Sequence, residues 1–336
     1  MKICYLGSEL ETHLLSTKAT LDCLRARGHK IEMRIWHYGK EEKEITFANS
    51  DADLFITDGH YNITPPSNIL WIQISHGISP YKPWGCSRVD NAIKMRLVPT
   101  TRWEKHVTKI RTGTSGVIPA DGWSKLDLYH NALRNKEELR AALYKKYKFD
   151  PKRPLIVYAP TGARANALTK KEWIAQYGSE KGYSWHGSYY HHLEVRKIVS
   201  SIANYYEILH PTISRTDDIK DRVPMMAISD IMIGDISSMS LEYTCVDKPI
   251  ILLKKHVSDC SPKDFRLFGE DTNPIVDLGD IIGIEELKDV LKYRLKHDDY
   301  KNIRRYWKKL LLGTVDGKCG EREADAIEQF WRKHEQ

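Results

Sequence analysis

The stretch Ser229–Leu253, "SDIMIGDISSMSLEYTCVDKPIILL", contains two short apolar runs separated by a turn and one helical segment. The runs "DIMIG" and "PIILL" are typical of buried strands, and "SMSLEYTCV" between them is typical of a helix. A strand, a helix and a second strand in this order predict a βαβ unit in a parallel sheet. Asp235, Ser237 and Ser238 then follow the carboxyl end of the first strand, where open α/β sheets bind their ligands.

The same alternation of short apolar runs and helical segments continues along the chain, which has no repeats and no low-complexity segments. A charged helical stretch at 135–149 ends at Asp150-Pro151, where a new strand begins. We therefore expect a Rossmann-like domain at 1–150, a second at 151–318, and a last helix at 319–336 that crosses back to the first. The expected strands are residues 2–7, 30–38, 53–57, 69–75, 96–100, 116–119, 154–160, 205–211, 230–235 and 249–253.

Composition narrows the classes of protein and partner. The 336 residues suffice for two cores, and neither a transmembrane run nor a signal peptide precedes Glu9 and Glu11, which predicts a cytoplasmic location. The six cysteines contain no C-x-x-C pair and predict neither a zinc site nor a disulfide framework. A net charge of +7 suits an anionic partner, which leaves nucleic acid, an anionic lipid surface and a phosphate-rich substrate open.

Polar residues follow several expected strands. Thr161 and Gly162 end "YAPTG", His210 lies in "LHPT", and His76 and Gly77 lie in "SHGI" of the first domain. Backbone N–H groups at the start of a helix, together with the hydroxyls of Ser237 and Ser238, can hold phosphate oxygens. The alternative is that Asp235 or Ser237 only caps the helix. Asp58, after the strand "DLFIT", is assigned to the acceptor side, with a plain turn as its alternative.

These motifs, in this order, resemble the CDP-glycerol glycerophosphotransferase family of teichoic acid and capsule enzymes. The family pattern is His-Gly, then Tyr-Ala-Pro-Thr, then His-Pro, then Ser-Asp-x-x-Ile-x-Asp-x-Ser-Ser before a helix and Lys-Pro-Ile-Ile, matched here over about residues 70–330. The chain departs from the pattern at Glu242, where the family has Asp, and before His210, where Ile208 and Leu209 replace an expected cation. Because of these departures, CDP-ribitol or a nucleotide sugar remains open as the donor.

The resemblance implies an α/β fold of the GT-B type, in which two Rossmann-like domains with parallel sheets face a central cleft. It also implies transfer of glycerol phosphate from a CDP-activated donor to a hydroxyl of a polyol phosphate or glycan, with release of CMP. His76 and His210 are the candidate catalytic residues, and Gly77 and Asp58 lie on the acceptor side. We expect no cofactor and no metal. The expected donor and phosphate ligands are Thr161, Gly162, Arg164, His210, Asp235, Ser237, Ser238 and Glu242.

Two other functions stay open at this point. A GT-B glycosyltransferase that uses a nucleotide sugar could modify nucleic acid, because nine Trp and eighteen Tyr can form stacking platforms for bases. A non-catalytic interaction protein on the same scaffold would bind no nucleotide. The positive charge also leaves open a peripheral contact with the inner face of the membrane. The insert from Ala163 to His192, rich in Gly, Ser, Tyr and His, is the expected lid over the donor.

Overall fold

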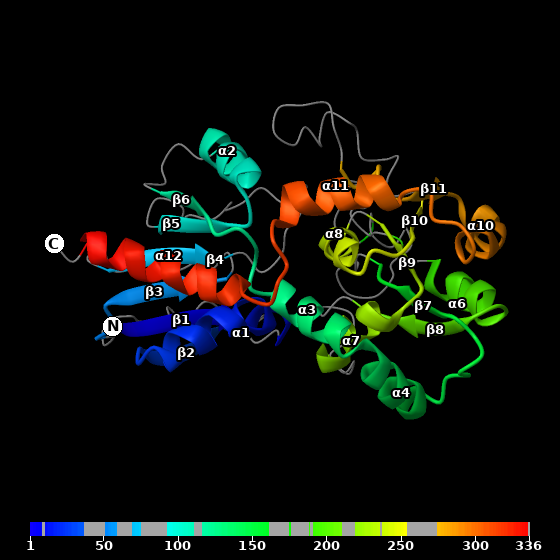
Figure 1. Ribbon diagram of the computed structural model, residues 1–336, viewed down its shortest axis with the longest axis horizontal. Helices are drawn as coiled ribbons and strands as arrows, with labels where there is room; N and C mark the ends of the chain where they lie inside the picture. Colours follow the sequence, from blue (N-terminus) through cyan, green and yellow to red (C-terminus); the bar gives the residue numbers. More distant parts are fainter. Residues whose placement is uncertain are drawn as a thin grey trace. The chain divides into compact units, whose positions relative to one another are not determined.

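Figure 1 shows the computed structural model, which describes residues 1–8, 11–36, 51–58, 69–74, 93–110, 116–160, 175, 188, 191–209, 219–235, 237–253 and 274–334. The chain forms two compact units. Unit 1 comprises Met1–Ile78, Lys82–His130 and Lys309–Gln336. Unit 2 comprises Ser79–Tyr81 and Asn131–Lys308.

Unit 1 is built on a parallel sheet with the strand order β2-β1-β3-β4-β5-β6. The residues of β3 are all buried, as expected for strands covered on both faces. Phe55 of β3 stacks on Trp71 of β4, with ring centroids 5.1 Å apart. The elements are β1 (Lys2–Ser8), α1 (Glu11–Ala26), β2 (Lys30–Trp36), β3 (Leu54–Thr57), β4 (Leu70–Ile74), β5 (Ile93–Val98), α2 (Thr101–Ile110), β6 (Val117–Pro119), α3 (Leu126–Arg134) and α12 (Cys319–His334).

The C-terminal helix α12 packs against α1 within unit 1 (Figure 1). Asp127 of α3 accepts hydrogen bonds from the backbone N–H groups of Cys319 and Gly320, both at 2.9 Å, and so caps the start of α12. A Cβ atom on Gly320 would lie 2.7 Å from the carbonyl carbon of Ala19, so glycine allows the two helices to approach closely.

Glu323 of α12 is a fully buried carboxyl group between α12 and α1. It accepts a hydrogen bond from the hydroxyl of Thr20 and one of 3.2 Å from the backbone N–H of Ser124. Burial, which outweighs these hydrogen bonds, raises the pKa of Glu323 to about 7, and the nearby Asp127 adds to the rise.

The raised pKa of Glu323 predicts that unit 1 becomes more stable as the pH falls from 7 towards 4.5. In this window the folded state holds a proton that the unfolded state releases, so the stabilisation is lost as the pH rises through 7. In Glu323→Gln, the glutamine retains one side-chain oxygen as a hydrogen-bond acceptor and has no charge. We expect this variant to melt at a higher temperature than the wild type at pH 8, by a stabilisation on the order of 3 kcal/mol, with less difference at pH 5.

Thermal unfolding at pH 5, 6, 7 and 8 measures this effect. Glu321→Gln is the matched control, because it removes an exposed carboxylate from the same helix. Equal pH dependence in the wild type, Glu323→Gln and Glu321→Gln would show that Glu323 does not carry the effect.

Unit 2 is built on a second parallel sheet with the strand order β11-β10-β9-β7-β8. One face is covered by α6 and α10, whose Val195, Val199, Leu287 and Leu291 pack with Ile156 and its neighbours in one apolar cluster. The elements are α4 (Lys136–Tyr147), β7 (Leu155–Tyr158), α6 (His192–Ser200), β8 (Asn204–Glu207), α7 (Ile219–Ile228), β9 (Ile231–Gly234), α8 (Ser238–Glu242), η3 (Tyr243–Cys245), β10 (Ile250–Leu253), β11 (Asp280–Ile282), η6 (Ile284–Glu286), α10 (Leu287–Arg294) and α11 (Lys301–Leu312).

The helices α6 and α7 belong to crossovers that run in opposite directions across this sheet. The connection β7–α6–β8 moves outward to an edge strand, whereas β8–α7–β9 returns past β7. Because such crossovers are right-handed, α7 lies on the face opposite α6. The sheet is therefore covered on both sides, which explains why β7, β9 and β10 are apolar along their whole length.

The two units divide at positions other than those expected from the sequence. The sequence predicted a division at residue 150, whereas the first unit gives way to the second at His130, within α3. The reason is α4, which packs on α7: Lys146 and Tyr147 both bond Asp221 at 2.6 Å. The return to unit 1 comes at Lys309, within α11, ahead of the expected residue 319.

Among the described residues, no helix combines the length and the apolar content that a membrane-spanning segment requires.

Candidate functional site

The turn between β9 and α8 carries the Asp-x-Ser-Ser motif. The hydroxyl of Ser237 accepts a hydrogen bond of 3.3 Å from the backbone N–H of Met239 and so caps α8. Ser238 is the first residue of α8 and is partly exposed, and its hydroxyl has no hydrogen bond to any described residue. The capping alternative thus describes Ser237, while the hydroxyl of Ser238, in the turn after β9, has no partner among the described residues.

Asp235 is fully buried beneath this turn. Its Oδ1 accepts a hydrogen bond of 3.1 Å from the backbone N–H of Ser237. Its Oδ2 accepts two from Ser188, 2.8 Å from the backbone N–H and 3.0 Å from the hydroxyl. The carboxylate therefore shapes the turn from inside the protein.

Ser188 was not singled out from the sequence, yet it joins two of the motifs. It lies near the end of the 163–192 insert and is fully buried. Its backbone carbonyl accepts a hydrogen bond from the hydroxyl of Tyr158, the first residue of "YAPTG", and burial raises the pKa of that tyrosine well above its ordinary value. Ser188 thus joins Tyr158, at the end of β7, to Asp235, which follows β9.

The sheet order places three of the motif-bearing strands side by side. β7 lies between β9 and β8, with Tyr158 opposite Ile233 on one side and Glu207 on the other. The carboxyl ends of neighbouring parallel strands meet at one edge of the sheet, so Ser237 and Ser238 share an edge with Ala159 and Pro160 of the second motif. Thr161, Gly162, Arg164 and His210 follow these strands but lie outside the described residues.

Glu242, the predicted acidic residue near the nucleotide, is the last residue of α8. Only 1% of its surface is exposed. Its distance in sequence from Ser238 is one helical turn, so it lies in the interior below the start of the helix.

In unit 1, Asp58 follows β3 and is buried, with 1% of its surface exposed. Its Oδ2 accepts a hydrogen bond of 2.6 Å from the hydroxyl of Tyr5 in β1, and burial raises the pKa of Tyr5 above its usual range. A Cβ atom on Gly7 would lie 2.5 Å from the Tyr5 ring, so the glycine leaves the space that this ring occupies. His76 and Gly77, which follow the adjacent strand β4, lie outside the described residues.

Metal-binding geometry is not found in the described part of the chain, where no three His, Cys, Asp or Glu side chains gather as ligands.

Residues 16–329 match the family described as CDP-glycerol:poly(glycerophosphate) glycerophosphotransferase. The chain belongs to this family. The match spans both units and confirms the resemblance predicted from the motifs. It identifies this glycerophosphotransferase-family protein as a transferase and does not favour the alternative of a glycosyltransferase that modifies nucleic acid. A sequence comparison with curated proteins gave no match.

Solved structures similar to this family member include the wall teichoic acid polymerase TagF. A variant of TagF has a TM-score of 0.64 at 15% identity and covers 99% of this chain and 90% of its own. A TagF structure soaked with CDPG has a TM-score of 0.62 at 15% identity, with coverage of 100% and 90%. UDP-GlcNAc 2-epimerase from Neisseria meningitidis, bound to UDP-GlcNAc, has a TM-score of 0.60 at 12% identity, with coverage of 98% and 100%. These likenesses concern the fold and confirm the predicted GT-B-type α/β architecture with two parallel sheets.

Proposed function

We propose that this protein transfers glycerol phosphate from CDP-glycerol to a hydroxyl of a polyol phosphate or glycan acceptor and releases CMP. The observation that carries the proposal is the family match over residues 16–329, which includes every motif of the candidate site. The TagF structure soaked with CDPG, which has the same fold, supports the choice of donor. We further propose that the protein works in the cytoplasm, with a peripheral contact at the inner membrane face.

In the proposed reaction the acceptor oxygen attacks the β-phosphorus of CDP-glycerol. A new P–O bond forms to the acceptor, the P–O bond to the α-phosphate breaks, and the bonding electrons leave with CMP. The hydroxyl proton passes to a base, for which His76 is our candidate because the unperturbed pKa of histidine lies near neutral pH. The reaction also needs donors for the charge on the phosphoryl oxygens.

Ser238, whose hydroxyl has no hydrogen bond to any residue that the structure describes, is our first candidate to contact the donor diphosphate. The backbone at the start of α8, which Ser237 orders, supplies further donors. We place Thr161, Gly162 and His210 around the same diphosphate because their strands neighbour β9. Arg164 supplies positive charge in our proposal, which therefore requires neither a metal nor another cofactor.

The test is calorimetric titration of CDP-glycerol into the wild type and into a variant with Ser237→Ala and Ser238→Ala. We expect donor affinity to fall about tenfold or more, since at least one hydrogen bond to a charged group is lost. Loss of the Ser237 cap should itself lower stability by about 1 kcal/mol, so a melting curve accompanies each titration.

Ser240→Ala is the matched control, because it removes a hydroxyl from the same helix that is buried and bonded to the Asp235 carbonyl oxygen at 2.9 Å. This variant should lose stability without losing donor affinity. Unchanged CDP-glycerol affinity in the double variant would remove the assignment of this turn. Binding of CDP-ribitol or UDP-GlcNAc in preference to CDP-glycerol would refute the proposed donor.

A further inference from the structure

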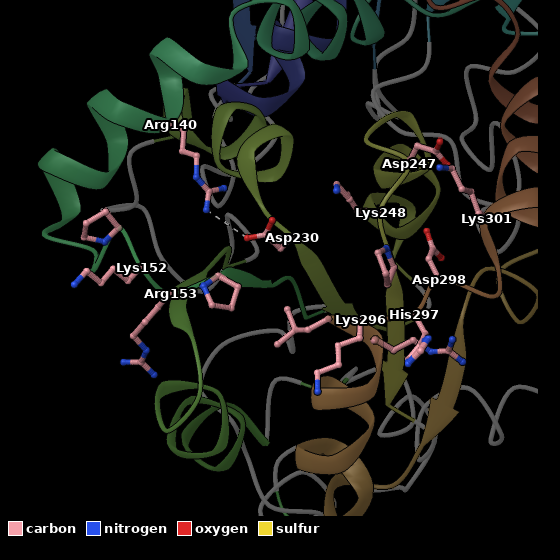
Figure 2. A pocket seen from close by; sticks show the side chains of 15 residues that line it. Arg140, Lys152, Arg153, Asp230, Asp247, Lys248, Lys296, His297, Asp298 and Lys301 are labelled. Carbon is pink, nitrogen blue, oxygen red and sulfur yellow. Dashed lines mark ion pairs between the residues drawn. The ribbon is translucent and has the colours of Figure 1, made fainter.

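A pocket of about 490 Å³ opens at the amino edge of the sheet in unit 2 (Figure 2). Its walls include Pro151–Pro154 before β7, Asp230 before β9 and Asp247–Pro249 before β10, and these three strands are neighbours in the sheet. The Asp-x-Ser-Ser turn follows the other end of β9. The pocket is therefore separate from the candidate donor site, which lies at the opposite edge of the same sheet.

The pocket has an excess of positive charge that its own carboxylates do not offset. Seven Lys and Arg side chains and three Asp side chains line it. Each Asp already has an arginine partner, and the lining residue Arg294 pairs with Asp280 and Asp299. The pairs are Arg140–Asp230 at 3.5 Å, Arg305–Asp247 at 2.7 Å and Arg304–Asp298 at 2.6 Å.

Four lysines of the lining have no ion pair or hydrogen bond from their side chains to any described residue: Lys152, Lys248, Lys296 and Lys301. Figure 2 shows Lys152 on one side of the pocket and Lys301 on the other, with Lys248 and Lys296 between them. Solvated lysines on a helix surface point away from one another, whereas these four come from separate segments and surround one cavity.

Two lysines at or beside the pocket occupy electrostatically unfavourable positions. Lys301 is the first residue of α11, a helix with no acidic residue in its first turn, so its charge adds to the positive end of the helix dipole. Lys136, the first residue of α4, lies outside the pocket lining; burial lowers its pKa and the charge of Lys248 lowers it further, against the opposing charges of Asp230 and Glu137. A bound anion would favour the charged form of both lysines.

We propose that this pocket binds an anion that carries two or more phosphate groups. The volume lies in the range of small-molecule sites, and lysines on several sides of the pocket suit several phosphates better than one. Phosphate groups are the anions that lysine binds as a point charge, without the planar geometry that arginine needs. Such a ligand can come from a soluble polyphosphate or phosphodiester chain, or from the headgroups of an anionic lipid surface.

The probe for this site is inorganic tripolyphosphate, titrated by calorimetry into the full chain. We expect binding to the wild type, and an affinity at least about tenfold lower in a variant with Lys248→Gln and Lys301→Gln. The matched control is Lys145→Gln with Lys288→Gln, which removes the same charge from exposed positions on α4 and α10 outside the pocket. Circular dichroism and melting curves check that both variants fold.

Equal tripolyphosphate affinity in the wild type and in both variants would overturn the inference, since Lys248 and Lys301 would then contribute nothing to binding. An equal loss in the pocket variant and in the control would also overturn it, since net charge alone would then explain binding. Sedimentation with phosphatidylglycerol vesicles distinguishes the source: reduced vesicle binding in the pocket variant alone indicates lipid headgroups, and unchanged vesicle binding indicates a soluble anion. CDP-glycerol affinity should be the same in all of these proteins, so failure here is separable from failure of the proposed donor site.

Discussion

His76→Ala should lower kcat for glycerol phosphate transfer by about 100- to 10,000-fold, the usual contribution of a general base, while CDP-glycerol still binds. The expectation rests on the position of His76 after β4, in unit 1, whereas the donor motifs follow β7, β8 and β9 of unit 2. A base that accepts the acceptor proton affects the chemical step and has no need to contact the nucleotide. Turnover under saturating donor, together with calorimetry, separates the two effects.

His210→Ala is the complementary variant, because His210 follows β8 in the sequence, and β8 lies beside β7, the strand of the "YAPTG" motif. It should lose donor affinity before it loses kcat. The wild-type pH profile of kcat should fall on the acid side as the base becomes protonated, and this limb should disappear in His76→Ala. His334→Ala, in an exposed residue near the C-terminus, serves as the control. If His76→Ala weakens donor binding and keeps kcat at saturating donor, the two roles are reversed.

Much of the fold was predictable because buried parallel strands have sequences that are short apolar runs. Each of the ten expected strands overlaps an observed one, and β9 and β10 lie where the opening stretch placed them. β11 (Asp280–Ile282) was missed because its three residues are too few to show a periodic pattern. The position of α4 in unit 2 was also missed, since its contact with Asp221 joins segments far apart in sequence.

The support of the candidate site could not be predicted, because it depends on contacts between distant polar residues. Ser188 and Asp235 are 47 positions apart, and a serine in a Ser-rich insert carries no signal of burial. Tyr5 and Asp58 are 53 positions apart, and Tyr5 occupies a place in β1 where any apolar residue fits the pattern. Sequence spacing identifies the strand ends, whereas only the fold shows which polar side chains form hydrogen bonds with one another.

The anion pocket illustrates the same limit for charge. Its cations come from α4, the loop before β7, the turn before β10, the end of α10 with the residues after it, and the start of α11. Each of these short segments resembles an ordinary solvated surface when it is considered alone. The sheet order brings the segments together, since the amino ends of adjacent parallel strands lie at one edge.

Asp235→Ala should loosen the 163–192 insert and, through it, the donor site. The substitution leaves the Ser188 N–H and hydroxyl without their acceptor and removes the bond that orders Ser237. Each lost bond to a buried carboxylate is worth about 1.5–3 kcal/mol, so a clear fall in melting temperature should accompany the change. We expect faster trypsin cleavage between 163 and 188, about tenfold lower kcat, and more hydrolysis of CDP-glycerol relative to transfer, because a lid that excludes water would be released.

General destabilisation must be separated from loss of this particular anchor. Asp221→Asn is the matched control. It removes the negative charge of a side chain in α7 that bonds Tyr147 and Lys146 of α4, in the same unit and away from the insert. This control should melt at a lower temperature without faster cleavage of the insert. Ser188→Ala removes one of the two bonds to Asp235 Oδ2 and should therefore give an intermediate cleavage rate, and its effect should be absent when Asp235 is already alanine. Cleavage of the insert at the wild-type rate in Asp235→Ala would mean that Ser188 is held by other contacts, and the link between the Asp-x-Ser-Ser motif and the lid would fail.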